Sequence, residues 1–182
     1  MLALALTMWT SAGAAELYGK VVAVADGDTL TVLDALERLH KVRLSAIDAP
    51  ERRQPYGERA KQHLLRLARG QSVLVRWHKR DRYGRLVGRV LLSECAGARC
   101  SFAKDVALEQ LRAGLAWHFT RYASEQPAEE RMRYAGTERE ARANREGLWA
   151  QAEPVPPWLF RRPLGAMPSR TGYGMAVPGT PG

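Results

Sequence analysis

The stretch from residue 17 to residue 33, LYGKVVAVADGDTLTVL, is the part of the sequence that decides the fold prediction. Val21, Val22 and Val24 have the β-branched side chains that favour a strand, and Thr29 to Leu33 has the composition of a returning strand. Asp26-Gly27-Asp28 between them is a typical turn sequence, because aspartate and glycine tolerate the backbone angles of a tight hairpin. We therefore predict a β-hairpin here.

The rest of the chain continues the mixed pattern. Further strands are predicted around Val42 to Ile47, at residues 72–77 and at residues 86–92, the last one after the tight turn at residues 81–84. Helices are predicted at residues 55–68, 102–113 and 125–146, and Gly70, Gly114 and Gly147 follow them as glycines that can end a helix. Five strands interrupted by three helices indicate an α+β fold, a five-stranded Greek-key OB-fold barrel.

Composition and charge favour a single basic domain. The chain has 182 residues and a formal net charge of +9, and this length suits one domain. Residues 40–89 carry fourteen Lys and Arg against four Asp and Glu, so this stretch holds the whole surplus. Coding bias explains the preference for Arg over Lys, but not the clustering, which points to a polyanion such as nucleic acid. No apolar stretch reaches the roughly 20 residues of a membrane span, and we expect a monomer without integral membrane association.

The two ends of the chain differ from its body. Residues 1–15 are apolar and uncharged and end in Ala14-Ala15, which is typical of a signal peptide and predicts a periplasmic or secreted protein. No basic residue precedes the apolar run. Two alternatives therefore remain: the true start codon lies upstream of Met1, or the segment is a first strand. Residues 16–150 form the predicted domain. Residues 151–182 are rich in Pro and Gly and predict an extended tail, disordered after about Leu164, in which residues 158–162 could dock back.

Cys95 and Cys100 are the two cysteines of the chain. A zinc site needs about two further soft ligands at ligand spacing, and the sequence offers none. In an exported protein a small loop-closing disulfide is the favoured interpretation, and a pair of free thiols is the alternative.

Three short segments carry residues suited to chemistry: 26–29 (Asp-Gly-Asp-Thr), 43–51 (Arg-Leu-Ser-Ala-Ile-Asp-Ala-Pro-Glu) and 81–85 (Asp-Arg-Tyr-Gly-Arg). Taken singly, they are a turn, the end of a strand and a polar hairpin loop. Taken together, they place acidic residues and arginines at strand ends that a barrel can bring together. That combination favours a catalytic site over three unrelated loops.

Such a set of residues supports phosphodiester hydrolysis. Asp28 and Asp48 offer the oxygen ligands that Ca²⁺ prefers, and the ion would polarise a phosphoryl oxygen. Glu51 can accept the proton of the attacking water. Arg43 and Arg85 can stabilise the charge that develops on the phosphate through paired N–H donors.

In order and spacing the three segments resemble the staphylococcal nuclease family. The resemblance covers about residues 18–150, including Ala-Gly-Leu-Ala-Trp at 113–117, Glu-Arg-Glu-Ala-Arg at 138–142 and Gly-Leu-Trp at 147–149. It implies an oligonucleotide-binding barrel with three helices. It also implies Ca²⁺-dependent cleavage of DNA and RNA at the 5′ P–O bond, which leaves 3′-phosphates.

The resemblance also assigns roles to single positions. Asp28 and Asp48 correspond to the side-chain metal ligands, and Ala49 stands where the family ligates through a backbone carbonyl. Glu51 would orient or deprotonate the attacking water, while Arg43 and Arg85 would hold the phosphate. The remaining assignments concern substrate binding, namely Arg82 and Tyr83 at the phosphate and nucleotide and Tyr122 near residues that stack on a base. The alternative to an enzyme is a non-catalytic nucleic-acid or protein-binding barrel, which has no need for the complete charged set.

Overall fold

A computed structural model describes residues 14–96 and 99–161 of the chain. Residues 1–13 of the predicted signal peptide and the tail beyond Arg161 lie outside the described residues, so both predictions stand untested there. The strands of the described part are β1 (Ala15–Val24), β2 (Thr29–Asp34), β3 (Leu39–Leu44), β4 (Ile47–Asp48), β5 (Ser72–Arg80), β6 (Leu86–Ala96), β7 (Arg99–Asp105) and β8 (Trp117–His118).

Five of these strands close into a ring. Strand β1 pairs antiparallel with β2 and with β5, β2 pairs antiparallel with β3, and β5 pairs antiparallel with β6. The ring closes because β3 runs parallel to β6, with Val42 opposite Leu86 and Leu44 opposite Gly88. A closed ring of this kind protects its strand edges. The predicted five-stranded α+β barrel is therefore confirmed within the described residues.

Strand β7 corrects one predicted helix. Residues 102–113 were expected to be helical, but residues 102–105 belong to β7, and helix α2 spans only Val106–Arg112. The reason is Asp105, whose carboxylate accepts hydrogen bonds from the N–H groups of Ala107 and Leu108 and so caps the first turn. Strand β7 pairs with β6 as an added sixth strand. The Cys95–Cys100 disulfide, the interpretation favoured for an exported protein, joins these two strands.

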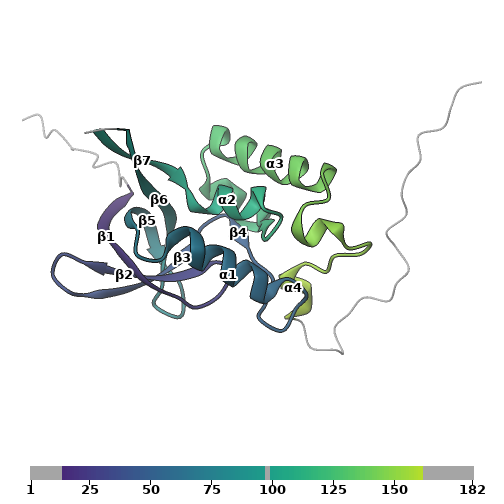
Figure 1. Ribbon diagram of the computed structural model, residues 1–182, viewed down its shortest axis with the longest axis horizontal. Helices are drawn as coiled ribbons and strands as arrows, with labels where there is room; N and C mark the ends of the chain where they lie inside the picture. Colours follow the sequence, from purple (N-terminus) through teal and green to yellow (C-terminus); the bar gives the residue numbers. More distant parts are fainter. Residues whose placement is uncertain (1–13, 97–98, 162–182) are drawn as a thin grey trace, which may run out of the picture.

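The longer helices lie together on one side of the barrel. Figure 1 shows α1 (Gly57–Ala68), α2 and α3 (Ala128–Ala143), and α2 contacts both of the others. Helix α3 is shorter than the predicted 125–146, because the 3₁₀ helix η1 (Thr120–Glu125) precedes it and Pro127 is its N-cap residue. After α3 come the 3₁₀ helix η2 (Gly147–Ala150) and helix α4 (Pro157–Phe160), which lies in the predicted tail. In the described residues, none of the helices has the length and apolarity needed to cross a membrane.

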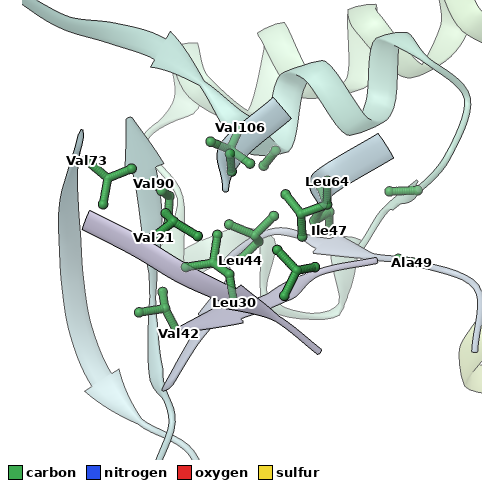
Figure 2. Packing of buried hydrophobic residues seen from close by; sticks show 14 of the residues in the cluster. Val21, Leu30, Val42, Leu44, Ile47, Ala49, Leu64, Val73, Val90 and Val106 are labelled. Carbon is green, nitrogen blue, oxygen red and sulfur yellow. The ribbon is translucent and has the colours of Figure 1, made fainter. Parts of the chain in front are cut away.

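The larger of two hydrophobic clusters in the described residues fills the barrel and its interface with α1 and α2. Figure 2 shows Val21, Leu30 and Leu44 from the strands packed toward Leu64 of α1 and Val106 of α2. Each of these side chains is at most 1% exposed, and burial of one such side chain contributes roughly 1.5–3 kcal/mol. Ala49, which follows β4, belongs to the same cluster, so the core continues up to the loop that carries site residues.

Candidate active site

The turn between β1 and β2 holds Asp28 in a buried position. Its Oδ1 accepts a hydrogen bond from the Thr29 hydroxyl at 3.0 Å. Its Oδ2 accepts the N–H of Ala49 at 2.9 Å. The second bond joins two loops that are 21 residues apart in the sequence, and it brings the first predicted segment against the second.

Gly27 allows this close approach. A Cβ atom at this position would lie 2.6 Å from the Cβ of Ala49 and 2.7 Å from the Cβ of Ala60 in α1. The Gly27 carbonyl accepts a hydrogen bond from the buried Gln110 side chain of α2, at 2.6 Å. The turn that carries Asp28 is therefore fixed by both α1 and α2.

Arg43 of β3 lies between the two aspartates. Its Nη2 donates to Asp48 Oδ1 at 2.9 Å, and its Nη1 forms an ion pair with Asp28 Oδ2. Asp48 is completely buried in β4, where its backbone pairs with Trp117 of β8. The short strand β4 is positioned by this pairing, so the Asp48 carboxylate is fixed from both its backbone and its side chain.

The environment moves the pKa values of these carboxyls in different directions. Burial, together with the neighbouring Asp28 charge, raises the pKa of Asp26 to about 6. Burial also acts to raise the pKa of Asp28, but the Arg43 charge and the Ala49 N–H outweigh it, so that pKa lies below its usual value. The pKa of Asp48 is raised because burial outweighs its bonds to arginine. The neighbouring arginines, Arg161 and Arg43, therefore act against burial and favour the ionised form of Asp48.

Arg85 is oriented by the loop that precedes it. Its Nε donates to Asp81 Oδ2 at 2.7 Å, and its Nη1 donates to the Thr29 hydroxyl at 3.1 Å. The other oxygen of Asp81 accepts the backbone N–H groups of Tyr83 and Arg85, at 2.9 and 3.0 Å. Asp81 thus holds the loop and the guanidinium together beside the Asp28 turn.

Glu51 lies on the loop between β4 and α1. Its backbone N–H donates to Gln54 Oε1 at 2.7 Å, which holds the loop in place. Its carboxylate accepts a hydrogen bond at 2.6 Å from Nη1 of Arg161, at the end of α4. Arg161 also contacts Asp48, with Nη2 at 2.6 Å from Oδ2. An arginine from the predicted tail therefore lies directly on two of the predicted site carboxylates.

A pocket of about 480 Å³ brings the predicted residues together. Eight of the nine predicted site residues line it: Asp28, Arg43, Ala49, Glu51, Arg82, Tyr83, Arg85 and Tyr122. Asp48 is absent from this lining because it lies buried below, covered by Arg43 and Arg161. The structure thus assembles the predicted set in one place, while the role of each residue stays a prediction.

Three residues of this region were not assigned to the site from the sequence. Asp26 and Arg161 line the pocket, and Asp81 orients Arg85. Asp26 and Asp81 had local signals, since each lies within a segment already singled out, but each was read as part of a turn. Arg161 had no such signal, because 113 residues separate it from Asp48.

The donor atoms of the site suit a hard cation. Asp28, Asp48 and Glu51 offer carboxylate oxygens, the ligand type that Ca²⁺ and Mg²⁺ prefer. In residues 14–96 and 99–161, no three side chains of His, Cys, Asp or Glu converge as a complete metal site. The protein would therefore supply part of a coordination sphere of six to eight oxygens, and water and a phosphate would supply the rest.

Comparison with known proteins gives the family. A family model described as "Staphylococcal nuclease homologue" matches residues 41–151. The chain belongs to the staphylococcal nuclease family. By family it is thus a nuclease, with nucleic acid as its substrate, and its barrel is the oligonucleotide-binding fold of staphylococcal nucleases.

Named relatives agree with this assignment. The chain is similar to an uncharacterized endonuclease of Escherichia coli O157:H7, with 36% identity over 147 residues, covering 81% of this chain and 86% of the relative. It is 39% identical to the protein ParB of Escherichia coli over 160 residues, 88% of each chain. It also matches the staphylococcal-like nuclease CAN1 of Arabidopsis thaliana with 38% identity over 129 residues, 71% of this chain and 35% of the plant protein.

Beside the candidate pocket lies a larger groove of about 980 Å³. Arg43, Arg82, Tyr83, Tyr122 and Arg161 line both the pocket and the groove, so the two are neighbours. The groove is rich in cationic side chains on β5, on β6 and after β8, namely Arg76, Lys79, Arg80, Arg89 and Arg121, with Glu125 and Glu130 among them. Part of the excess of Lys and Arg noted in the sequence therefore lines this groove, which extends away from the pocket.

Proposed function

We propose that this nuclease is an exported enzyme that hydrolyses DNA and RNA with Ca²⁺ bound at Asp28 and Asp48. It breaks the 5′ P–O bond and leaves 3′-phosphates. The observation that carries the proposal is the pocket itself, in which Glu51, Arg43 and Arg85 lie around the two aspartates. A barrel that only binds nucleic acid needs the cations but has no use for the buried acidic group among them.

The residues of the chain divide the chemistry among themselves. Bound Ca²⁺ would supply charge that polarises a phosphoryl oxygen, with Asp28, Asp48 and the Ala49 carbonyl as its protein ligands. The Glu51 carboxylate takes a proton from water as the water oxygen bonds to phosphorus. As the bond from phosphorus to the 5′ oxygen breaks, Arg43 and Arg85 donate N–H bonds to the equatorial phosphate oxygens. The departing 5′ oxygen takes up a proton and leaves as a hydroxyl group.

The surroundings support binding of a nucleotide chain without base selection. Tyr83 is 66% exposed and Tyr122 is 51% exposed at the pocket. The guanidinium groups of Arg82 and Arg85 lie over the Tyr83 ring and Nζ of Lys79 lies over the Tyr122 ring, so a base that stacks there has to displace these cations. Stacking on an aromatic ring contributes roughly 1–3 kcal/mol per base with little sequence preference. Arg82 contacts the Tyr83 hydroxyl at 2.7 Å and can serve a phosphate beside it. Such contacts suit both DNA and RNA.

The assay is cleavage of single-stranded DNA, double-stranded DNA and RNA with Ca²⁺ or with a chelator. We expect cutting of each substrate with Ca²⁺ alone, and products that carry 3′-phosphates. Glu51→Ala and Arg85→Ala should each lower the rate by about 10²–10³-fold, the usual loss for one transition-state donor. Arg66→Ala, at an exposed position of α1 that lines neither cavity, is the matched control and should cut normally.

Two outcomes of this assay would contradict the proposal. Intact nucleic acid in every tube, with folded protein, would favour the alternative of a binding module. Full activity of Arg85→Ala would remove the assigned role of that arginine.

Export is proposed from the composition of residues 1–15, and the disulfide supports it. Disulfides persist mainly in oxidising compartments, and Cys95 and Cys100 are bonded. When the full gene is expressed in a Gram-negative host, mass spectrometry of the periplasm and medium should find a mature chain that begins at Ala15 or Glu16. Recovery of the uncut chain in the cytoplasm would contradict export.

A further inference from the structure

The segment after η2 returns to the barrel and is anchored there at several points. The carbonyl of Val155 accepts a hydrogen bond from the Gln54 side chain at 3.1 Å. Pro157 is buried, and the ring of Trp158 packs against Trp117 and Phe119, with centroids 5.6 and 5.4 Å apart. These contacts fix α4 against the loop that carries Glu51. They also determine the position of Arg161, which directly follows α4.

The Arg161 guanidinium bridges two carboxylates. Nη2 lies 2.6 Å from Asp48 Oδ2, and Nη1 lies 3.2 Å from Asp48 Oδ1 and 2.6 Å from Glu51 Oε1. Paired charge-assisted bonds of this kind are among the stronger polar contacts in proteins. The Asp48 side chain is only 1% exposed in this arrangement. Arg161 and Arg43 together cover the carboxylate from which a metal ion would take its ligand oxygen.

We propose that Arg161 is a built-in competitor of the metal ion, which holds Asp48 and Glu51 until Ca²⁺ displaces its guanidinium. The proposal rests on the proposed function, because it takes Asp48 as a metal ligand and Glu51 as the proton acceptor. A guanidinium and a divalent cation need the same oxygens, so the two states exclude each other. While Arg161 is bound, both oxygens of Asp48 and Oε1 of Glu51 are bonded to guanidinium groups, so a metal ion has to displace Arg161 to reach Asp48. The C-terminal segment would thereby keep the nuclease inactive at low Ca²⁺.

Competition by Arg161 weakens the apparent affinity of the site for the metal ion. When a site is open for only a fraction of the time, its apparent dissociation constant is the intrinsic one divided by that fraction. Removal of the competitor therefore tightens metal binding without any new ligand. The Arg161 side chain is 45% exposed, so the contact is partly screened by water and the effect should be moderate.

The test measures binding of Ca²⁺ alone to the full chain by titration calorimetry, without nucleic acid. Arg161→Gln should bind Ca²⁺ about tenfold more tightly than the parent. Trp158→Ala, which loosens α4 but keeps the charge, should shift the constant in the same direction by a smaller factor. Arg66→Gln removes an exposed arginine outside both cavities and should leave the constant unchanged. Nitrogen-15 NMR of the arginine side chains should show the Arg161 signal change when Ca²⁺ is added to the parent chain.

Each other outcome is decisive. Equal or weaker Ca²⁺ binding by Arg161→Gln, in a parent chain that binds Ca²⁺ and cuts nucleic acid, would overturn the competitor and leave the nuclease function standing. Absence of Ca²⁺ binding and of cutting in both proteins would overturn the proposed function, and the competitor with it. Circular dichroism of each variant shows that the compared proteins are folded.

Discussion

Gly27 packs against the hydrophobic core and lies next to Asp28, a predicted metal ligand. Its missing side chain leaves room for Ala49 and Ala60, each of which would lie less than 3 Å from an added Cβ. The neighbouring Asp28 depends on this contact, because its Oδ2 accepts the Ala49 N–H. A single methyl group at Gly27 should therefore separate the two loops that carry the aspartates.

Gly27→Ala is expected to destabilise the protein by about 1–3 kcal/mol, the usual cost of overpacking, and to lower nuclease activity. Gly136→Ala is the matched control in α3, since its added Cβ would meet only the end of Arg139, at 3.9 Å. Alanine has a higher helix propensity than glycine, so Gly136→Ala should increase the free energy of unfolding by roughly 0.5–1 kcal/mol. Urea unfolding followed by circular dichroism measures both effects. Equal stability of the two variants would refute the packing argument.

At the scale of the residue, local motifs singled out side chains that the structure places together, while their distant contact with Arg161 was not predicted. Asp28, Asp48 and Arg85 each stand in a short segment whose residue types and spacing carry information. The Arg161 contact depends on where α4 docks, which Trp158 and the Gln54 side chain decide through tertiary packing. No pattern within the tail indicates that contact, although its aromatic residues suggested that the tail could dock.

At the scale of the element, strands were easier to predict than the exact ends of helices. The alternating and β-branched segments gave the five barrel strands, because one face of each had to be apolar. Strand β7 was missed because Phe102 to Lys104 contains no clear alternation and leads directly into an apolar helix. The aspartate at 105 was the available signal for the boundary, since a capping residue marks where a helix begins.

Asp105, at the boundary between β7 and α2, also contacts residues of other elements. Its Oδ2 accepts the Tyr134 hydroxyl of α3 at 2.9 Å and Nε of Arg89 from β6 at 2.6 Å. Burial, together with the Asp105 charge, raises the pKa of Tyr134, so the phenol stays a donor. One residue thus caps α2 and links it to α3 and to the barrel.

The β2–β3 hairpin is closed by a single carboxylate. Asp34 Oδ1 accepts the N–H groups of Leu36 and Arg38, both at 2.9 Å. Its Oδ2 accepts Nε2 of His40 at 2.9 Å and Nε of Arg38 at 2.8 Å. These bonds, the one with His40 foremost, hold the pKa of Asp34 well below its usual value.

Asp34→Asn should therefore lower the melting temperature at pH 7. A lowered pKa stabilises the fold above the unfolded value of about 3.9, and this contribution is lost as the pH falls through the folded value. The difference between variant and parent should shrink steadily below about pH 4. Glu37→Gln, at an exposed position of the same turn, removes the same formal charge and should change the melting temperature at pH 7 very little. A difference for Asp34→Asn that stays constant with pH would contradict this account.

At the scale of the whole molecule, part of the positive charge of the chain lines a groove beside the candidate pocket. The groove shares several lining residues with the candidate pocket, so under the proposed function we expect that a nucleic-acid strand bound in one continues into the other. The sequence predicted the surplus and its location between residues 40 and 89. It could not predict the contribution of Arg121, which joins the groove because η1 folds against the barrel.

Arg121→Gln should weaken nucleic-acid binding and reduce its dependence on salt. Loss of one phosphate contact should reduce the slope of log K against log salt by about 0.7 for a single strand. Fluorescence anisotropy with a labelled oligonucleotide, in a chelator that prevents cutting, measures the slope. Arg66→Gln is the control and should keep the slope of the parent. An unchanged slope for Arg121→Gln would place the bound strand elsewhere.

The contact of the Asp28 turn with Ala49 and α1 has a consequence for how the protein unfolds. Ala49 and Ala60 belong to the main hydrophobic cluster, and the Ala49 amide is bonded to Asp28. We therefore expect that the two loops that carry Asp28 and Ala49 do not open on their own while the core stays intact. In hydrogen exchange, the Ala49 amide should be protected to the level of global unfolding, unlike amides in exposed loops, which open locally. Heat should then remove the active site and the barrel in a single cooperative transition.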